Sequence, residues 1–262
     1  MPLVLAGERL DLPGVRTVSF LDDPTLAPPV TDRSQRTRRT RAIVIHSHSG
    51  TASGAVKPGR RDTDDAATAL ALYQARTSRK VSWDFTIGRD ARVIQQNDPA
   101  AWFTWHATSW NAISVGIELI QDADGAFYAE QLSACVALVD CLTRVFRIQR
   151  QIAWRSGSPH LALIYRADEQ GPSKGADMVG VFAHVHNTTN RGKGDPGPAP
   201  FTALAAAGYE RYDFTTGADL ATWRTRQVQL GVKPDGIALD ATCDALAATH
   251  TPHGLWVARP GD

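Results

Sequence analysis

The sequence lacks the features typical of membrane proteins, nucleic-acid binders and disulfide scaffolds. No apolar run approaches the roughly 18 residues that a transmembrane helix needs, so we expect no insertion into a membrane. The net charge is only +1 over 262 residues, which gives no reason to expect a nucleic-acid partner. Three scattered cysteines, Cys135, Cys141 and Cys243, are too few for a disulfide framework. The composition is that of an ordinary soluble globular protein.

Two other absences concern export and catalysis. Met1–Glu8 has no basic segment, and its apolar run is too short for a secretory signal, so we expect synthesis in the cytoplasm. The sequence also contains no His-Glu-x-x-His, the helical motif that supplies two zinc ligands in many metallopeptidases. Any metal site must therefore be assembled from separate parts of the chain.

A loop near the C-terminal third brings together groups that can bind a metal. The apolar, β-branched run 178–183 reads as a buried strand, and His184 follows it directly. The same loop carries Lys193 and then Asp195, whose backbone is stiffened by the following Pro-Gly-Pro. Imidazole nitrogen and carboxylate oxygen are suitable zinc ligands, and a hydrolytic zinc site needs about three from the protein. This loop supplies two of them.

Two further apolar strands carry polar groups. The strand that starts at Arg41 ends in His46, which could be the third ligand. The strand Ser114–Ile120 is interrupted by Glu118, and a carboxylate on a core strand is costly unless it is paired, hydrogen-bonded or in a cleft. Strands separated by helices and long gaps predict an α/β fold with a mixed central β-sheet flanked by helices.

These motifs together resemble the zinc-dependent N-acetylmuramoyl-L-alanine amidase family, which is related to phage T7 lysozyme and the peptidoglycan recognition proteins. The resemblance covers about residues 40–205, and five motifs occur in the family's order. They are His46 after its strand, Val81–Ile87, Trp105-His-Ala107, Asn111 with Val115–Glu118, and His184 with Lys193-Gly-Asp195-Pro-Gly.

The resemblance implies a function and a role for each site residue. It implies cleavage of the amide bond between N-acetylmuramic acid and the L-alanine of the peptidoglycan stem peptide, with Zn²⁺ as cofactor. Zinc would be held by His46, His184 and Asp195. Glu118 would transfer protons, and Lys193 would stabilise the oxyanion. The alternative is a peptidoglycan recognition module on the same fold that binds without catalysis.

Other residues are assigned less directly by the resemblance. Trp83, His106 and His186 are candidate substrate contacts. His186 also competes with His184 as the second ligand, because both lie on the same local alternation. We favour His184, which directly follows the strand and is therefore held more rigidly. Asp84 departs from the family, which often has histidine at this place.

The chain divides into three predicted parts. Residues 1–40 form an extended lead-in with one short strand around Val15–Phe20, 41–208 form the amidase domain, and 209–262 form a helical tail that resembles part of a peptidoglycan-binding module. Periodicity predicts helices over 63–76, with Ala66, Leu70 and Tyr73 buried, and over 127–148. The segment 149–177 is expected to be an exposed hairpin or loop.

The expected partner is peptidoglycan or a muropeptide. The sequence leaves the oligomeric state open, with a monomer favoured. Because no signal is evident, action on a cell wall would require lysis, injection or non-classical export. An endolysin-like phage lysin, an injected effector and a recycling enzyme all fit these expectations.

Overall fold

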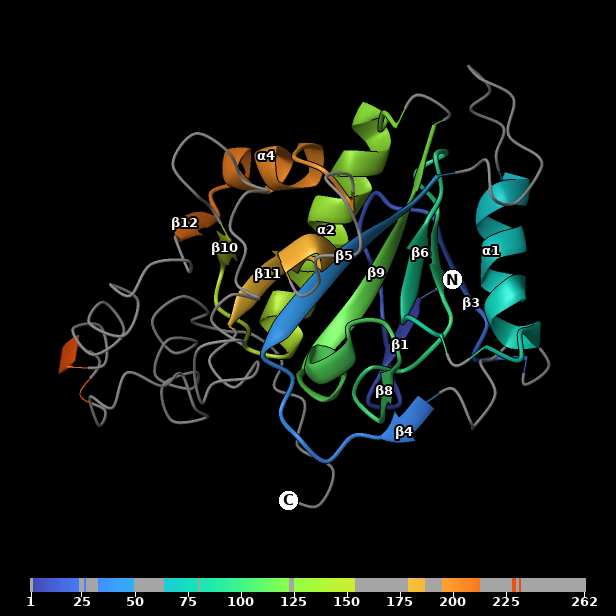
Figure 1. The fold of residues 1–262 in the computed structure, drawn as a ribbon, viewed down its shortest axis with the longest axis horizontal. Helices are drawn as coiled ribbons and strands as arrows, with labels where there is room; N and C mark the ends of the chain where they lie inside the picture. Colours follow the sequence, from blue (N-terminus) through green and yellow to red (C-terminus); the bar gives the residue numbers. More distant parts are fainter. Residues whose placement is uncertain are drawn as a thin grey trace.

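A mixed β-sheet, with eight strands among the described residues, forms the centre of the fold. The computed structural model describes residues 2–23, 26, 33–49, 64–79, 81–122, 125–153, 179–186, 195–212, 228–229 and 231. The sheet order is β12-β10-β11-β5-β9-β6-β7-β3, and helices flank it (Figure 1). All of its neighbouring strands run parallel except the β6–β7 pair. The predicted fold class, an α/β protein with a mixed central sheet, is confirmed.

The two longest strands lie at the centre of the sheet. They are β5 (Ala42–Ser49) and β9 (Ser114–Gln121), which pair in parallel over their full lengths. The other six are β3 (Thr17–Ser19), β6 (Phe85–Ile87), β7 (Val93–Gln95), β10 (Gln151–Ala153), β11 (Gly180–Ala183) and β12 (Glu210–Tyr212). β6 and β7 form an antiparallel pair. The predicted apolar strands before His46, around Glu118 and before His184 correspond to β5, β9 and β11.

Side chains of β5 and β9 alternate between the main core on one face of the sheet and the candidate site on the other. Ile43 and Ile45 of β5 and Ile117 and Leu119 of β9 belong to the main core, which also contains the apolar stripe of α2. Successive strand side chains point to opposite faces of a sheet. His46 therefore lies on the face opposite that core.

Among the residues that the structure describes, three α-helices flank the sheet. They are α1 (Asp64–Arg76), α2 (Ala129–Val145) and α4 (Ala199–Ala206), with α4 beside α2 and α1 apart from both (Figure 1). Ala66 and Leu70 of α1 are buried as predicted. The predicted burial of Tyr73 is wrong, because its side chain is 43% exposed. Within the described part of the chain, no helix is both long and apolar enough to cross a membrane.

The N-terminal residues are built into the fold. They form β1 (Leu3–Leu5) and β2 (Glu8–Leu10), which pair with each other, then β3 and β4 (Arg33–Gln35), which pairs with β8 (Trp102–Thr104). Leu3 and Leu5 are fully buried in the main core. The described part of the lead-in, which was predicted to be extended, thus contains four strands, and the short strand expected within it is β3.

Both edge strands of the sheet, β3 and β12, come from outside the 41–208 span predicted for the domain. Each is only three residues long and contains polar side chains, so neither shows a clear alternation. Of the predicted loop 149–177, residues 151–153 form β10, and residues 154–178 lie outside the described residues. Most of the predicted tail lies outside them as well.

Asp84 joins several of these elements from a fully buried position. Its Oδ2 accepts hydrogen bonds from the Gly116 N–H at 2.8 Å and from Thr104 Oγ1 at 3.3 Å. Its Oδ1 accepts from Asn97 Nδ2 at 2.8 Å. Burial raises the pKa of Asp84 from 3.8 to about 6, although the positive charge of Arg36 and these hydrogen bonds oppose the shift.

This raised pKa predicts how stability depends on pH. Folded Asp84 binds its proton more tightly than the unfolded chain does, so the resulting stabilisation is complete below pH 3.8 and is lost as the pH rises through about 6. Asp84→Asn cannot titrate. The free energy of unfolding of the wild type minus that of the variant should therefore fall by on the order of 2–3 kcal/mol between pH 4 and 7. Urea unfolding of both proteins across this range checks it, and a pH-independent difference would contradict it.

Candidate metal centre

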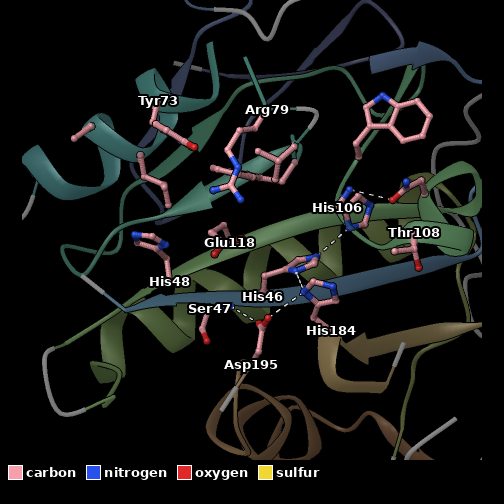
Figure 2. A pocket seen from close by; sticks show the side chains of 16 residues that line it. His46, Ser47, His48, Tyr73, Arg79, His106, Thr108, Glu118, His184 and Asp195 are labelled. Carbon is pink, nitrogen blue, oxygen red and sulfur yellow. Dashed lines mark hydrogen bonds and ion pairs between the residues drawn. The ribbon is translucent and has the colours of Figure 1, made fainter. Parts of the chain in front are cut away.

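A pocket of about 1110 Å³ opens on the sheet face opposite the α2 core. The central strand β5 provides its floor, and residues of α1, of the Val81–Trp105 region and of the loop before α4 provide its walls (Figure 2). The three predicted zinc ligands and Glu118 all line this pocket. Lys193, predicted to stabilise an oxyanion, lies outside the described residues.

The sheet register brings the two histidines together. β11 pairs with β5 so that Ala183 lies beside Ile45. A histidine follows each of these two residues. His46 follows Ile45 on β5, and His184 follows Ala183 at the start of the 3₁₀ helix η4 (His184–His186). Their Nδ1 atoms are 2.8 Å apart, and both side chains are buried. Two residues 138 positions apart in sequence thus share one site.

Asp195 completes the cluster from the loop before α4. Its Oδ2 lies 3.0 Å from His184 Nδ1, and its Oδ1 accepts the backbone N–H of Ser47 at 2.8 Å. The ligand atoms of His46, His184 and Asp195 all lie within 4.8 Å of one another. Two imidazoles and one carboxylate, each held by neighbouring structure, form a donor set that suits a zinc ion.

Glu118 lies next to this cluster on the adjoining strand. The β5–β9 register pairs Glu118 directly with His46. The side chain is half-buried and points into the pocket beside the histidines (Figure 2). The costly carboxylate on a core strand is therefore explained by the pocket, where water or a ligand can solvate it.

His106 contacts the cluster directly. Its Nδ1 lies 3.0 Å from Nε2 of His46, and the two rings meet edge to face. Burial, with the nearby His184 and Arg36, lowers the pKa of His106 to about 3. His106 also lines the pocket, and its contact with substrate stays a prediction. The contact with a candidate ligand was not predicted from the sequence.

His184 and His186 have different surroundings. His186 is fully buried, its Nδ1 accepts the backbone N–H of Ala183 at 2.9 Å, and its ring lies against Phe182 and Phe201. It is not one of the described residues that line the pocket. This position corrects the expectation that His186 contacts substrate, because an imidazole enclosed by core aromatics cannot reach a ligand in the pocket.

Trp83 serves two purposes in the structure. Its ring is buried with Leu70 and Ile120 in the cluster under α1, and its Nε1–H donates to Thr86 Oγ1 at 2.8 Å. Trp83 also lines the pocket. Trp83 is therefore mainly a core residue with a surface available to a ligand.

Several further residues that line the pocket were not among the predicted site residues. Tyr73 and Arg79 lie at the rim near the end of α1 (Figure 2), and hydrogen bonds from Thr77 and Arg79 lower the pKa of Tyr73. His48 follows His46 by two residues on β5, and this i, i+2 spacing was the signal that could have placed it on the same face. No local pattern marked Arg79.

Comparison with known proteins agrees with this arrangement of motifs. The sequence model of the family described as N-acetylmuramoyl-L-alanine amidase matches residues 36–198. No curated protein sequence matches the chain significantly.

Solved structures similar to the chain include an endolysin, an AmpD derivative and a peptidoglycan recognition protein. A mutant endolysin from Bacillus subtilis has 25% identity and a TM-score of 0.39, over 52% of this chain and 80% of that chain. A selenomethionine derivative of AmpD has 19% identity and a TM-score of 0.43, over 77% and 98%. The Drosophila peptidoglycan recognition protein SA has 21% identity and a TM-score of 0.37, over 50% and 73%.

Proposed function

The chain belongs to the N-acetylmuramoyl-L-alanine amidase family, and on that premise we propose that it is a zinc-dependent peptidoglycan hydrolase. The bond cleaved would be the amide between N-acetylmuramic acid and the L-alanine of the stem peptide. The observation that carries this proposal is the convergence of His46, His184 and Asp195 within 4.8 Å, with Glu118 on the neighbouring strand.

The donor set supports zinc as the cofactor. Nδ1 of His46, Nδ1 of His184 and Oδ2 of Asp195 would hold the ion, while Asp195 Oδ1 stays fixed by the Ser47 N–H. Zinc bound there would supply Lewis acidity and would make a water molecule acidic enough to attack at neutral pH. The pocket beside the three ligands leaves room for water and for the scissile amide.

Glu118 would carry the protons that amide hydrolysis requires. Its half-buried carboxylate faces the same space as His46 and can take a proton from the attacking water. It can then donate that proton to the nitrogen of the leaving L-alanine. Lys193 remains the proposed donor to the oxyanion of the tetrahedral intermediate, because it lies two residues before Asp195 in the sequence.

Removal of the metal is the direct test. Chelation should abolish the release of stem peptides from purified sacculi, and added zinc should restore it, because no nucleophilic serine or cysteine is part of the proposed site. Mass spectrometry of the digest identifies the bond that is cut. Full hydrolysis by a preparation shown to be metal-free would contradict the zinc mechanism.

The same experiment distinguishes the alternative, a recognition module. A zinc-loaded protein that binds muropeptides but releases no product would support recognition without catalysis. The hydrolase is favoured because the chain retains three metal-binding side chains and a carboxylate beside them.

A further inference from the structure

We propose that His106 is a positioning residue that sets the protonation pattern of His46. By accepting the Nε2–H of His46, it would leave the Nδ1 lone pair of His46 facing His184 and Asp195. This inference rests on the proposed zinc site. It assigns to His106 a role that acts through a ligand and does not involve contact with the metal.

A series of hydrogen bonds runs from the backbone carbonyl of Trp110 through Ser114 and His106 to His46. The carbonyl fixes the direction of every bond in this series. A carbonyl oxygen can only accept, so the single hydroxyl hydrogen of Ser114 points to the Trp110 carbonyl, 2.7 Å away. The Ser114 oxygen can then accept from Nε2 of His106, which lies 3.2 Å from it. The hydrogen of a neutral His106 is thereby placed on Nε2.

The same logic continues to the metal ligands. With its hydrogen on Nε2, His106 has a lone pair on Nδ1, 3.0 Å from Nε2 of His46. His46 must then carry its own hydrogen on Nε2. Its Nδ1 is left as an electron-pair donor, 2.8 Å from Nδ1 of His184. If His106 instead donated from Nδ1 to Nε2 of His46, a neutral His46 would carry its hydrogen on Nδ1. That hydrogen would occupy the space where a metal would have to bind.

The ring of His106 is held in the orientation that this chain requires. Asn111 Oδ1 accepts the backbone N–H groups of His106 at 3.0 Å and Ala107 at 2.6 Å. On the other side lies Gly116, where a Cβ atom would come within 2.8 Å of His106 Cγ and 2.9 Å of its Nδ1. Glycine is required there by this close approach, because any larger residue would displace the imidazole.

Hydrogen-bond partners of metal-binding histidines affect the affinity for the metal. Metal-binding histidines usually donate their second ring N–H to such a partner, and loss of the partner typically lowers metal affinity about 10- to 100-fold. Here the partner is itself a histidine, so its acceptor nitrogen depends in turn on Ser114.

The first test is made on the metal-free wild-type protein. Nitrogen-15 NMR distinguishes protonated from unprotonated ring nitrogens, and we expect His46 to be unprotonated at Nδ1 and protonated at Nε2. A hydrogen found on Nδ1 of His46 overturns the proposal. This measurement needs neither zinc nor activity, so it decides the inference even if the protein proves not to be a zinc hydrolase.

The second test compares zinc affinities by chelator competition. His106→Ala should bind zinc about 10- to 100-fold more weakly, whereas His106→Asn, whose Oδ1 can accept in place of Nδ1, should recover most of the affinity. The exposed Ser109→Ala is a matched control and should bind as the wild type does. The proposal is overturned if His106→Ala binds zinc as tightly as the wild type does. It is also overturned if His106→Asn loses as much zinc affinity as His106→Ala while both variants have the melting temperature of the wild type.

Discussion

Glu118→Gln should lower amidase turnover by about 100- to 10,000-fold while zinc content and muropeptide binding stay near wild type. The register of β9 against β5 places this carboxylate beside His46, inside the pocket. Glutamine keeps the shape and size of the side chain but cannot carry the proton. Turnover on sacculi, zinc content and muropeptide affinity are the three measurements.

A matched control separates this effect from a general change of charge. Glu130, in the first turn of α2, is exposed and does not line the pocket, so Glu130→Gln should retain wild-type turnover. If Glu118→Gln also hydrolyses sacculi at nearly the wild-type rate, Glu118 has a structural role and another group carries the proton. Loss of zinc from Glu118→Gln would instead mean that the carboxylate supports the metal site.

A pair of histidine variants should give the next largest effect. His184→Ala removes one of three proposed ligands, so bound zinc should be lost. Turnover should fall by roughly 1000-fold or more, because a catalytic metal contributes several kcal/mol and each 1.4 kcal/mol is about tenfold in rate. His186→Ala should keep its zinc, because this ring lies between Phe182 and Phe201 and not in the pocket.

His186→Ala should instead make the folded protein less stable. Removing a buried ring leaves a cavity, which should lower the free energy of unfolding by about 2–4 kcal/mol. Metal analysis and urea unfolding of both variants distinguish the two histidines. Zinc loss in His186→Ala with zinc retained in His184→Ala would reverse the ligand assignment while leaving the amidase proposal intact.

The central strands and their chemistry were predictable because alternation is a local signal. The apolar runs before His46, around Glu118 and before His184 mark β5, β9 and β11. The sequence could not give the order of these strands in the sheet. That order, which is set by long-range packing, is what brings His184 to His46.

Three features escaped sequence reasoning for identifiable reasons. Of the N-terminal strands, β1, β2 and β4 are too short to show a period, although Leu3 and Leu5 are core residues. Tyr73 follows Leu70 at helical spacing, but α1 extends over the pocket, and the side chain there meets solvent. Strand alternation made His186 a competitor of His184 for the ligand position. The chain instead turns into a 3₁₀ helix at His184, and there a spacing of two residues no longer means the same face.

The alternation of β5 also has a consequence for protein engineering. Changes at His48 would sample new surfaces of the pocket, because this side chain lines it. The neighbouring positions Ile43 and Ile45 would meanwhile keep their contacts with the α2 core. Substitutions at His48 can thus be screened for altered substrate preference with little loss of folding yield, provided that His46 and Ser47 are left unchanged.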